Sequence, residues 1–136
     1  MKNLRIVVVD DSPIIRDYLR TTFNRTEGCT VVGTAGDGIE AVKIIRELRP
    51  HVVVLDITMP HRNGIEVLRD IRKEESNMVI IMFTADPSVV LEEICLKEGA
   101  DHYLSKSEVL ELVDICKELV RSNRMRCSAS NSRETF

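Results

Sequence analysis

Five chemically active side chains in this sequence each follow a short run of apolar residues. They are Asp10, Asp11, Asp56, Thr84 and Lys106. Two carboxylates about 4 Å apart repel by roughly 4 kcal/mol at an effective dielectric constant of 20, so three carboxylates around one crevice would need cations. The lysine supplies one positive charge, and a divalent metal ion would supply more. Carboxylate ligands without histidine or cysteine suit Mg²⁺, which commonly bridges to a phosphate.

Such a set of side chains is suited to the transfer of a phosphoryl group onto a carboxylate. Asp56 would attack phosphorus and form an acyl phosphate. The metal ion, Lys106 and the hydroxyl group of Thr84 would neutralise the oxygens of the transferred group. Each residue taken singly has an ordinary alternative role, as a turn or cap residue or as a solvated charge. The hypothesis therefore depends on the joint pattern.

The elements that position these side chains can be predicted from the apolar pattern. Unbroken apolar runs predict strands that are buried on both faces, and the segments between them repeat apolar residues at helical spacing. The predicted strands cover 4–9, 29–34, 51–55, 78–83 and 102–104, and the helices begin near Ser12, Asp37, Asn63, Asp86 and Ser107. Five alternations predict an α/β fold with a parallel sheet between layers of helices. The five side chains would then converge at the carboxyl ends of the strands, where such sheets bind ligands.

Length and composition narrow the class of protein. The chain has 136 residues, a net charge of −3, 43% hydrophobic residues and 30% charged residues. This size suits one domain, and the charge argues against direct nucleic-acid binding. No apolar run approaches the ~20 residues of a membrane-spanning helix, and the first residues show no signal-peptide pattern. The cysteines are dispersed, which is typical of a reducing compartment, and the dispersed histidines and cysteines do not suggest a metal cluster. Together with the absence of a long apolar run, this predicts a cytoplasmic protein that does not bind membranes.

The apolar period ends near Arg121, and this sets the predicted domain boundary. We predict one domain over residues 1–121 and a disordered tail over residues 122–136, which are rich in serine, asparagine and arginine. The tail is too short for a second domain. We therefore predict that the chain acts alone, without a DNA-binding domain of its own.

The sequence resembles the receiver domain of bacterial two-component response regulators, and among these the single-domain chemotaxis regulators. The resemblance extends from Leu4 to about Val120. It rests on VVVDDSP at 7–13, GDGIEA at 36–41, VVVLDITMPHRNG at 52–64, MFTAD at 82–86 and EGADHYLSK at 98–106. It implies a flavodoxin-like (βα)5 fold, in which a doubly wound parallel sheet has five strands in the order 2-1-3-4-5.

The resemblance also implies a partner and a metal site. Asp56 would be phosphorylated by a sensor histidine kinase or by a histidine phosphotransfer protein. Mg²⁺ would be held by three carboxylates and one main-chain carbonyl group, those of Asp10, Asp11, Asp56 and Thr58. The chain would then be a phosphoprotein of a two-component system.

Further residues match positions that switch or tune receiver domains. Thr84 matches the switch hydroxyl, and Lys106 matches the lysine that binds the phosphoryl group. Tyr103 matches the aromatic switch position, whose ring turns inward when Thr84 moves toward the phosphoryl group. Thr58 and Asp86 occupy variable positions that flank the pocket and tune the lifetime of the phosphoryl group.

One departure from the family pattern follows Lys106. The family usually has a proline at the next position, with a cis peptide bond before it, and this sequence has Ser107. A non-proline cis bond costs about 3–4 kcal/mol, so the sequence leaves the isomer of this bond open. Ser107 could instead act as the N-cap of the last helix.

We predict a phosphorylation-driven switch that catalyses only its own phosphorylation and dephosphorylation. Its downstream protein target would bind the face formed by the fourth helix, the fifth strand and the fifth helix. A phosphorelay intermediate that passes the phosphoryl group to a histidine phosphotransfer protein is an alternative. A phosphatase of the haloacid-dehalogenase type would need a D-x-D motif where Asp10 and Asp11 are adjacent. A flavin-binding electron carrier would need a glycine- and hydroxyl-rich loop where DDSP stands.

Overall fold

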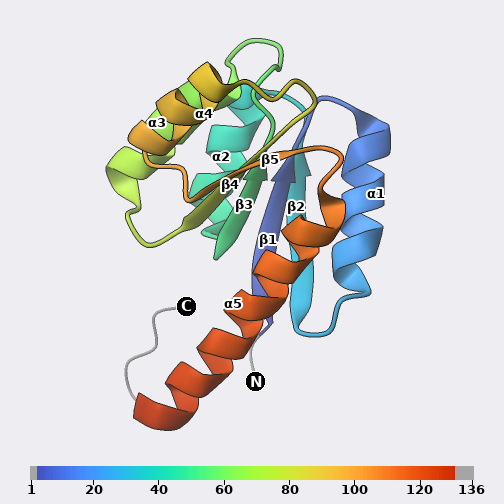
Figure 1. The fold of residues 1–136 in the computed structure, drawn as a ribbon, viewed down its shortest axis with the longest axis vertical. Coiled ribbons are helices and arrows are strands. Elements are labelled where there is room, and N and C mark those ends of the chain that lie inside the picture. Colours follow the sequence, from blue (N-terminus) through green and yellow to red (C-terminus); the bar gives the residue numbers. More distant parts are fainter. Residues whose placement is uncertain (1–2, 131–136) are drawn as a thin grey trace.

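Strands and helices alternate along the chain and form one parallel sheet between two layers of helices (Figure 1). The computed structural model describes the backbone of residues 3–130 and the side chains up to residue 122. The strands are β1 (Leu4–Val9), β2 (Cys29–Ala35), β3 (Val52–Leu55), β4 (Val79–Thr84) and β5 (His102–Ser105). The helices are α1 (Pro13–Asn24), α2 (Gly38–Leu48), α3 (Gly64–Glu74), α4 (Val89–Lys97) and α5 (Val109–Ser130). The strand order β2-β1-β3-β4-β5 confirms the predicted flavodoxin-like topology.

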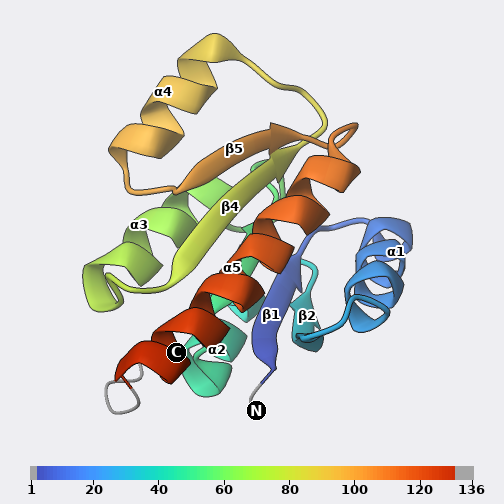
Figure 2. The same cartoon turned by 60° about the horizontal axis from the view of Figure 1, so that its bottom comes forward.

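The sheet separates two apolar cores because successive side chains of a strand point to opposite faces. On one face Val7 and Val9 pack with buried residues of α2 and α3 and with Cys95 of α4. On the other face Ile6 and Val8 pack with buried residues of α1 and α5. Figure 2 shows α5 in front of the sheet, with α2 and α3 behind it. Burial on both faces explains why the strands are unbroken apolar runs.

Side-chain caps fix the beginnings of three helices where the sequence predicts them. Ser12 is the N-cap of α1, and Pro13 follows it as the first helical residue. Asp37 caps α2 in the same way. Asn63 and Glu66 form a reciprocal capping box at the start of α3. These caps satisfy backbone N–H groups that have no partner within the helix.

The fourth helix begins later than the sequence predicts. We expected it to open at Asp86, but α4 begins at Val89 with Ser88 as its N-cap. The N–H group of Asp86 donates instead to the Thr84 hydroxyl oxygen at 3.2 Å, which holds the chain in a turn at the end of β4. The predicted start was wrong because this hydrogen bond competes with the helix.

The fifth helix also begins later, and Ser107 is not its cap. Ser105 to Glu108 forms a turn in which the Glu108 carboxylate accepts from the Ser105 N–H group at 2.8 Å. The N–H group of Ser107 donates to the Ser105 hydroxyl oxygen at 3.1 Å, and α5 starts at Val109. The peptide bond between Lys106 and Ser107 is trans. The sequence left the isomer of this bond open, and the structure has the ordinary trans form.

Helix α5 continues to Ser130, beyond Arg121 (Figure 1). The sequence predicts disorder from residue 122, but residues 122–130 contain no glycine or proline. Arginine, methionine and alanine favour helix, so the loss of the apolar period does not end it. The rest of the predicted tail lies outside the described residues. In the described range, neither this helix nor any other is long and apolar enough to cross a membrane.

Gly64 lets the loop after β3 return onto the end of that strand. Its N–H group donates to the Ile57 carbonyl oxygen at 2.7 Å, and a side chain at this position would overlap the carbonyl oxygen of Asp56. On the other side, the N–H group of Asp56 donates to the Val9 carbonyl oxygen at 2.9 Å. The backbone of Asp56 is therefore fixed between β1 and the start of α3.

Candidate functional site

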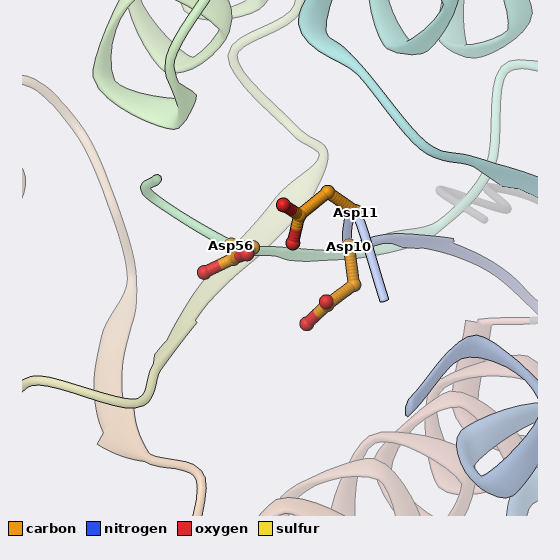
Figure 3. A group of neighbouring side chains, drawn as sticks. All are labelled: Asp10, Asp11 and Asp56. Carbon is orange, nitrogen blue, oxygen red and sulfur yellow. The ribbon is translucent and has the colours of Figure 1, made fainter. Parts of the chain in front are cut away.

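The topological switch point between β1 and β3 brings three acidic residues together. Val9 at the end of β1 lies opposite Leu55 at the end of β3, so Asp10 and Asp56 leave the sheet side by side. Asp11 follows directly, and carboxylate oxygens of the three aspartates lie within 4.8 Å of one another (Figure 3). Asp10 is only 2% exposed and Asp56 only 4%, whereas Asp11 is exposed. The register of β1 and β3 therefore brings these residues together, as the sequence predicts.

Lys106 places one positive charge against the two buried carboxylates. Its Nζ lies 2.7 Å from Asp10 Oδ2 and 3.6 Å from Asp56 Oδ2. The N–H group of Lys106 donates to the Thr84 carbonyl oxygen at 2.8 Å, which fixes its main chain just beyond β5. Burial alone would lower the pKa of Lys106, but the hydrogen bond to Asp10 and the charges of Asp56 and Asp10 raise it overall. The ammonium group is therefore charged and shared between two acids.

The lysine does not neutralise the whole cluster. Burial raises the pKa of Asp56 to about 6, and the charge of Asp10 adds to this effect while that of Lys106 opposes it. Three carboxylates thus face one ammonium group. A divalent cation would relieve the remaining repulsion, and a donor set made only of carboxylates fits Mg²⁺. The residues present therefore fit the predicted metal.

Asp10 is held through both its side chain and its main chain. Its Oδ1 accepts from the Ser12 N–H group at 2.9 Å, and its main-chain oxygen accepts from Arg16 Nη1 at 2.7 Å. Sequence reasoning did not single out Arg16. The available signal was a basic residue one helical turn after the N-cap, close to the acid pair.

Thr84 and Tyr103 both bind the loop between β4 and α4. The buried Thr84 hydroxyl oxygen accepts from the Asp86 N–H group at 3.2 Å. The Tyr103 hydroxyl oxygen accepts from the N–H group of Ser88, also at 3.2 Å. Burial raises the pKa of Tyr103, and the hydrogen bond from Ser88 opposes this only in part. Sequence reasoning did not predict the hydrogen bond from the Ser88 N–H group to Tyr103.

Two further candidate residues lie on exposed loops. Thr58 is exposed on the loop that follows Asp56, and Asp86 is exposed on the loop that follows Thr84. The Thr58 carbonyl group as a metal ligand, and both side chains as tuning residues, stay predictions.

A doubly wound parallel sheet with an acid cluster and a lysine at its switch point is the arrangement that the resemblance to receiver domains implies. The sequence profile of the response regulator receiver domain matches residues 6–118, and the chain belongs to this family. Response regulators, to whose family the chain belongs, act in two-component signal transduction. Among curated relatives, the DNA-binding response regulator MtrA of Mycolicibacterium smegmatis is 40% identical over 120 residues, which cover 88% of this chain and 51% of MtrA.

Solved structures of response regulators share the fold. A LuxR-family two-component response regulator from Aurantimonas sp. SI85-9A1 is 34% identical with a TM-score of 0.82, and the match covers 89% of this chain and 87% of that one. A chain in the CheX-CheY-BeF3-Mg+2 complex from Borrelia burgdorferi is 32% identical with a TM-score of 0.74, over 81% of this chain and 86% of that one.

The chain spans about half the length of the curated relatives it matches. MtrA is named as DNA-binding, so this relative does not support the sequence-based expectation that nucleic acid is no partner. The activities of the longer relatives belong to those proteins.

The raised pKa of Asp56 predicts that this residue destabilises the folded chain when it is ionised. The folded pKa of about 6 lies above the ordinary value of 3.8, so the folded state holds the proton more tightly. Stability then falls as the pH rises from about 4 to about 6. We expect Asp56→Asn to increase the free energy of unfolding near neutral pH, without metal, by ~1–3 kcal/mol in urea titrations. The gain should shrink as the pH falls toward about 4.

Asp17→Asn is the matched control, because the Asp17 side chain is 76% exposed. It should leave the free energy of unfolding nearly unchanged over the same pH range. An Asp56→Asn variant that is less stable than the wild-type chain near neutral pH would contradict the destabilising role of this carboxylate.

Proposed function

We propose that this chain is a phosphorylation-driven switch that accepts a phosphoryl group on Asp56. The donor would be a phosphohistidine of a sensor histidine kinase or of a histidine phosphotransfer protein, as membership of the family implies. The observation that supports this most directly is the buried Asp56 carboxylate beside Asp10 and Lys106, at the switch point of the sheet. A carboxylate that is neither fully paired nor solvated is suited to nucleophilic attack.

In the proposed reaction, an oxygen of Asp56 forms a bond to phosphorus while the bond from phosphorus to the donor's imidazole nitrogen breaks. The electron pair of that bond returns to the imidazole. Lys106 shifts from the acids toward the incoming phosphoryl oxygens and neutralises part of their charge. Asp10 stays in place because the Ser12 N–H group and Arg16 hold it.

Mg²⁺ would be held by Asp10, Asp11 and Asp56, with the Thr58 carbonyl group as a further ligand. When bound, it would offset the charge of the acids and of the phosphoryl oxygens. The CheX-CheY-BeF3-Mg+2 complex from Borrelia burgdorferi, one chain of which is similar to this one, supports this assignment by similarity.

The switch would begin at Thr84. Its hydroxyl group now accepts from the Asp86 N–H group, and a phosphoryl oxygen on Asp56 would attract the hydroxyl proton. The loop that leads to Ser88 would move, and Ser88 is the hydrogen-bond partner of Tyr103. Phosphorylation would thereby bias the positions of α4 and the Tyr103 ring between two states.

The output surface would be the face formed by α4, β5 and α5. Large apolar side chains are exposed in the first turns of α4 and α5: Val89 is 75% exposed, Val90 64% and Leu110 82%. Such residues suit a protein target better than open solvent. The chain would act in the cytoplasm and catalyse only its own phosphorylation and dephosphorylation. Onward transfer to a histidine phosphotransfer protein is the alternative fate of the phosphoryl group.

Incubation with acetyl phosphate and Mg²⁺, followed by intact-mass measurement, tests the acceptor. We expect the wild-type chain to gain the mass of one phosphoryl group, and we expect a metal chelator to prevent the gain. Asp56→Asn should abolish it because the nucleophilic oxygen is lost. Asp17→Asn should be labelled like the wild-type chain. Equal labelling of Asp56→Asn and the wild type would overturn the assignment of Asp56.

Replacement of the Thr84 hydroxyl group tests the switch separately from phosphorylation. Thr84→Val keeps the shape of the side chain and the Asp56 nucleophile, so it should still be labelled by acetyl phosphate, although more slowly because the hydroxyl group no longer contacts the transferred oxygens. Its amide NMR shifts in α4 and β5 on phosphorylation should be much smaller than those of the wild-type chain. Thr84→Ser, which keeps the hydroxyl group, should retain them. Wild-type shifts in Thr84→Val would exclude the proposed path through Thr84.

A further inference from the structure

Arg16 reaches from α1 to the main chain of the acid pair. Its Nη1 donates to the Asp10 carbonyl oxygen at 2.7 Å, in a partly buried position. The guanidinium group also lies against Gly36 at the end of β2, where a Cβ atom would come within 2.9 Å of Nη1. Among the residues that the structure describes, no carboxylate forms an ion pair with Arg16. Its hydrogen bond to this carbonyl group is therefore its specific contact near the site.

This contact restrains the backbone on one side of Asp11. The Asp10 carbonyl group belongs to the peptide plane that precedes the Cα atom of Asp11, and Arg16 holds that plane. The peptide plane that follows the same Cα atom contains the Ser12 N–H group, which donates to Asp10 Oδ1 at 2.9 Å. With both flanking planes held, the direction in which the exposed Asp11 side chain leaves the backbone is set, while its carboxylate can still rotate about the side-chain single bonds.

We infer that Arg16 is a positioning residue for the metal site, because it orients Asp11 toward the place where a divalent cation would bind. This inference rests on the proposed Mg²⁺ site. Groups that orient metal ligands typically change metal affinity about 10- to 100-fold when they are removed. The role is distinct from charge, since a guanidinium group close to a cation repels it.

The sign of the change in affinity separates the two effects. Removal of a positive charge by itself would tighten the binding of Mg²⁺. Loss of the orientation of Asp11 would weaken it. A weaker complex in Arg16→Gln therefore cannot come from the charge change.

Isothermal titration calorimetry of the full chain with Mg²⁺ alone is the test. We expect Arg16→Gln to raise the dissociation constant for Mg²⁺ about tenfold. Arg20→Gln is the matched control: it removes the same charge one turn further along α1, where Arg20 contacts only the Thr34 hydroxyl group and Asp17 in the described structure. It should leave the constant unchanged or lower it slightly. Urea titration without metal establishes that each variant is folded.

Gly36→Ala displaces the guanidinium group while its charge stays. The added methyl group would press against the end of the Arg16 side chain, which can move, and the backbone of Gly36 is not in the left-handed region. We expect a smaller weakening of Mg²⁺ binding in this variant. The same substitution in an Arg16→Gln chain should have no further effect, because the group that it displaces is gone.

Three outcomes decide the inference. Weaker binding in Arg16→Gln but not in Arg20→Gln, with the non-additive effect of Gly36→Ala, supports the positioning role. Equal or tighter binding in Arg16→Gln overturns the positioning role and leaves the Mg²⁺ site intact. Failure of the wild-type chain to bind Mg²⁺ overturns both the positioning role and the proposed Mg²⁺ site. In that case Asp11→Asn gives the same titration as the wild type, because neither chain binds the metal.

Discussion

The structure of the site depends on two buried carboxylates that share one lysine. Asp10 and Asp56 lie at the ends of neighbouring strands because β1 and β3 pair in register, and burial makes their mutual repulsion expensive. Lys106 binds Asp10 closely and reaches Asp56 only at 3.6 Å. The second carboxylate is therefore left with excess negative charge, and this excess suits the roles of metal ligand and nucleophile that we propose for it.

The elements around the site differ in how firmly they are held, and this difference suits a switch. Helix α5 packs on the sheet through Leu112, Cys116 and Val120, all of them buried. Helix α4 has Cys95 as its buried residue, and its first turn exposes Val89 and Val90. An element with little apolar burial can move at a small loss of free energy. The loop that Thr84 and Tyr103 bind leads directly into this loosely packed helix.

The strands and the first three helix caps could be predicted from the sequence because their signals are local, whereas the order of the sheet was implied only by the resemblance to receiver domains. An apolar run buried on both faces, or a serine before a proline, depends on adjacent residues. The convergence of Asp10, Asp56 and Lys106 follows from the rule that strand ends meet at one edge. The later starts of α4 and α5 could not be predicted, since hydrogen bonds to Thr84 and within the turn at Ser105 decide them. Arg16 escaped prediction because its partner is a main-chain carbonyl group, which has no residue-type signature.

Direct titration of the Asp56 carboxyl group by carbon-13 NMR tests most sharply whether excess negative charge governs the site. The signal can be assigned by its absence in Asp56→Asn. Without metal, the pKa of Asp56 should be about 6, because burial and the charge of Asp10 raise it, and Mg²⁺ should lower it markedly. A pKa near the ordinary value of 3.8 without metal, or a pKa that Mg²⁺ does not change, would contradict this.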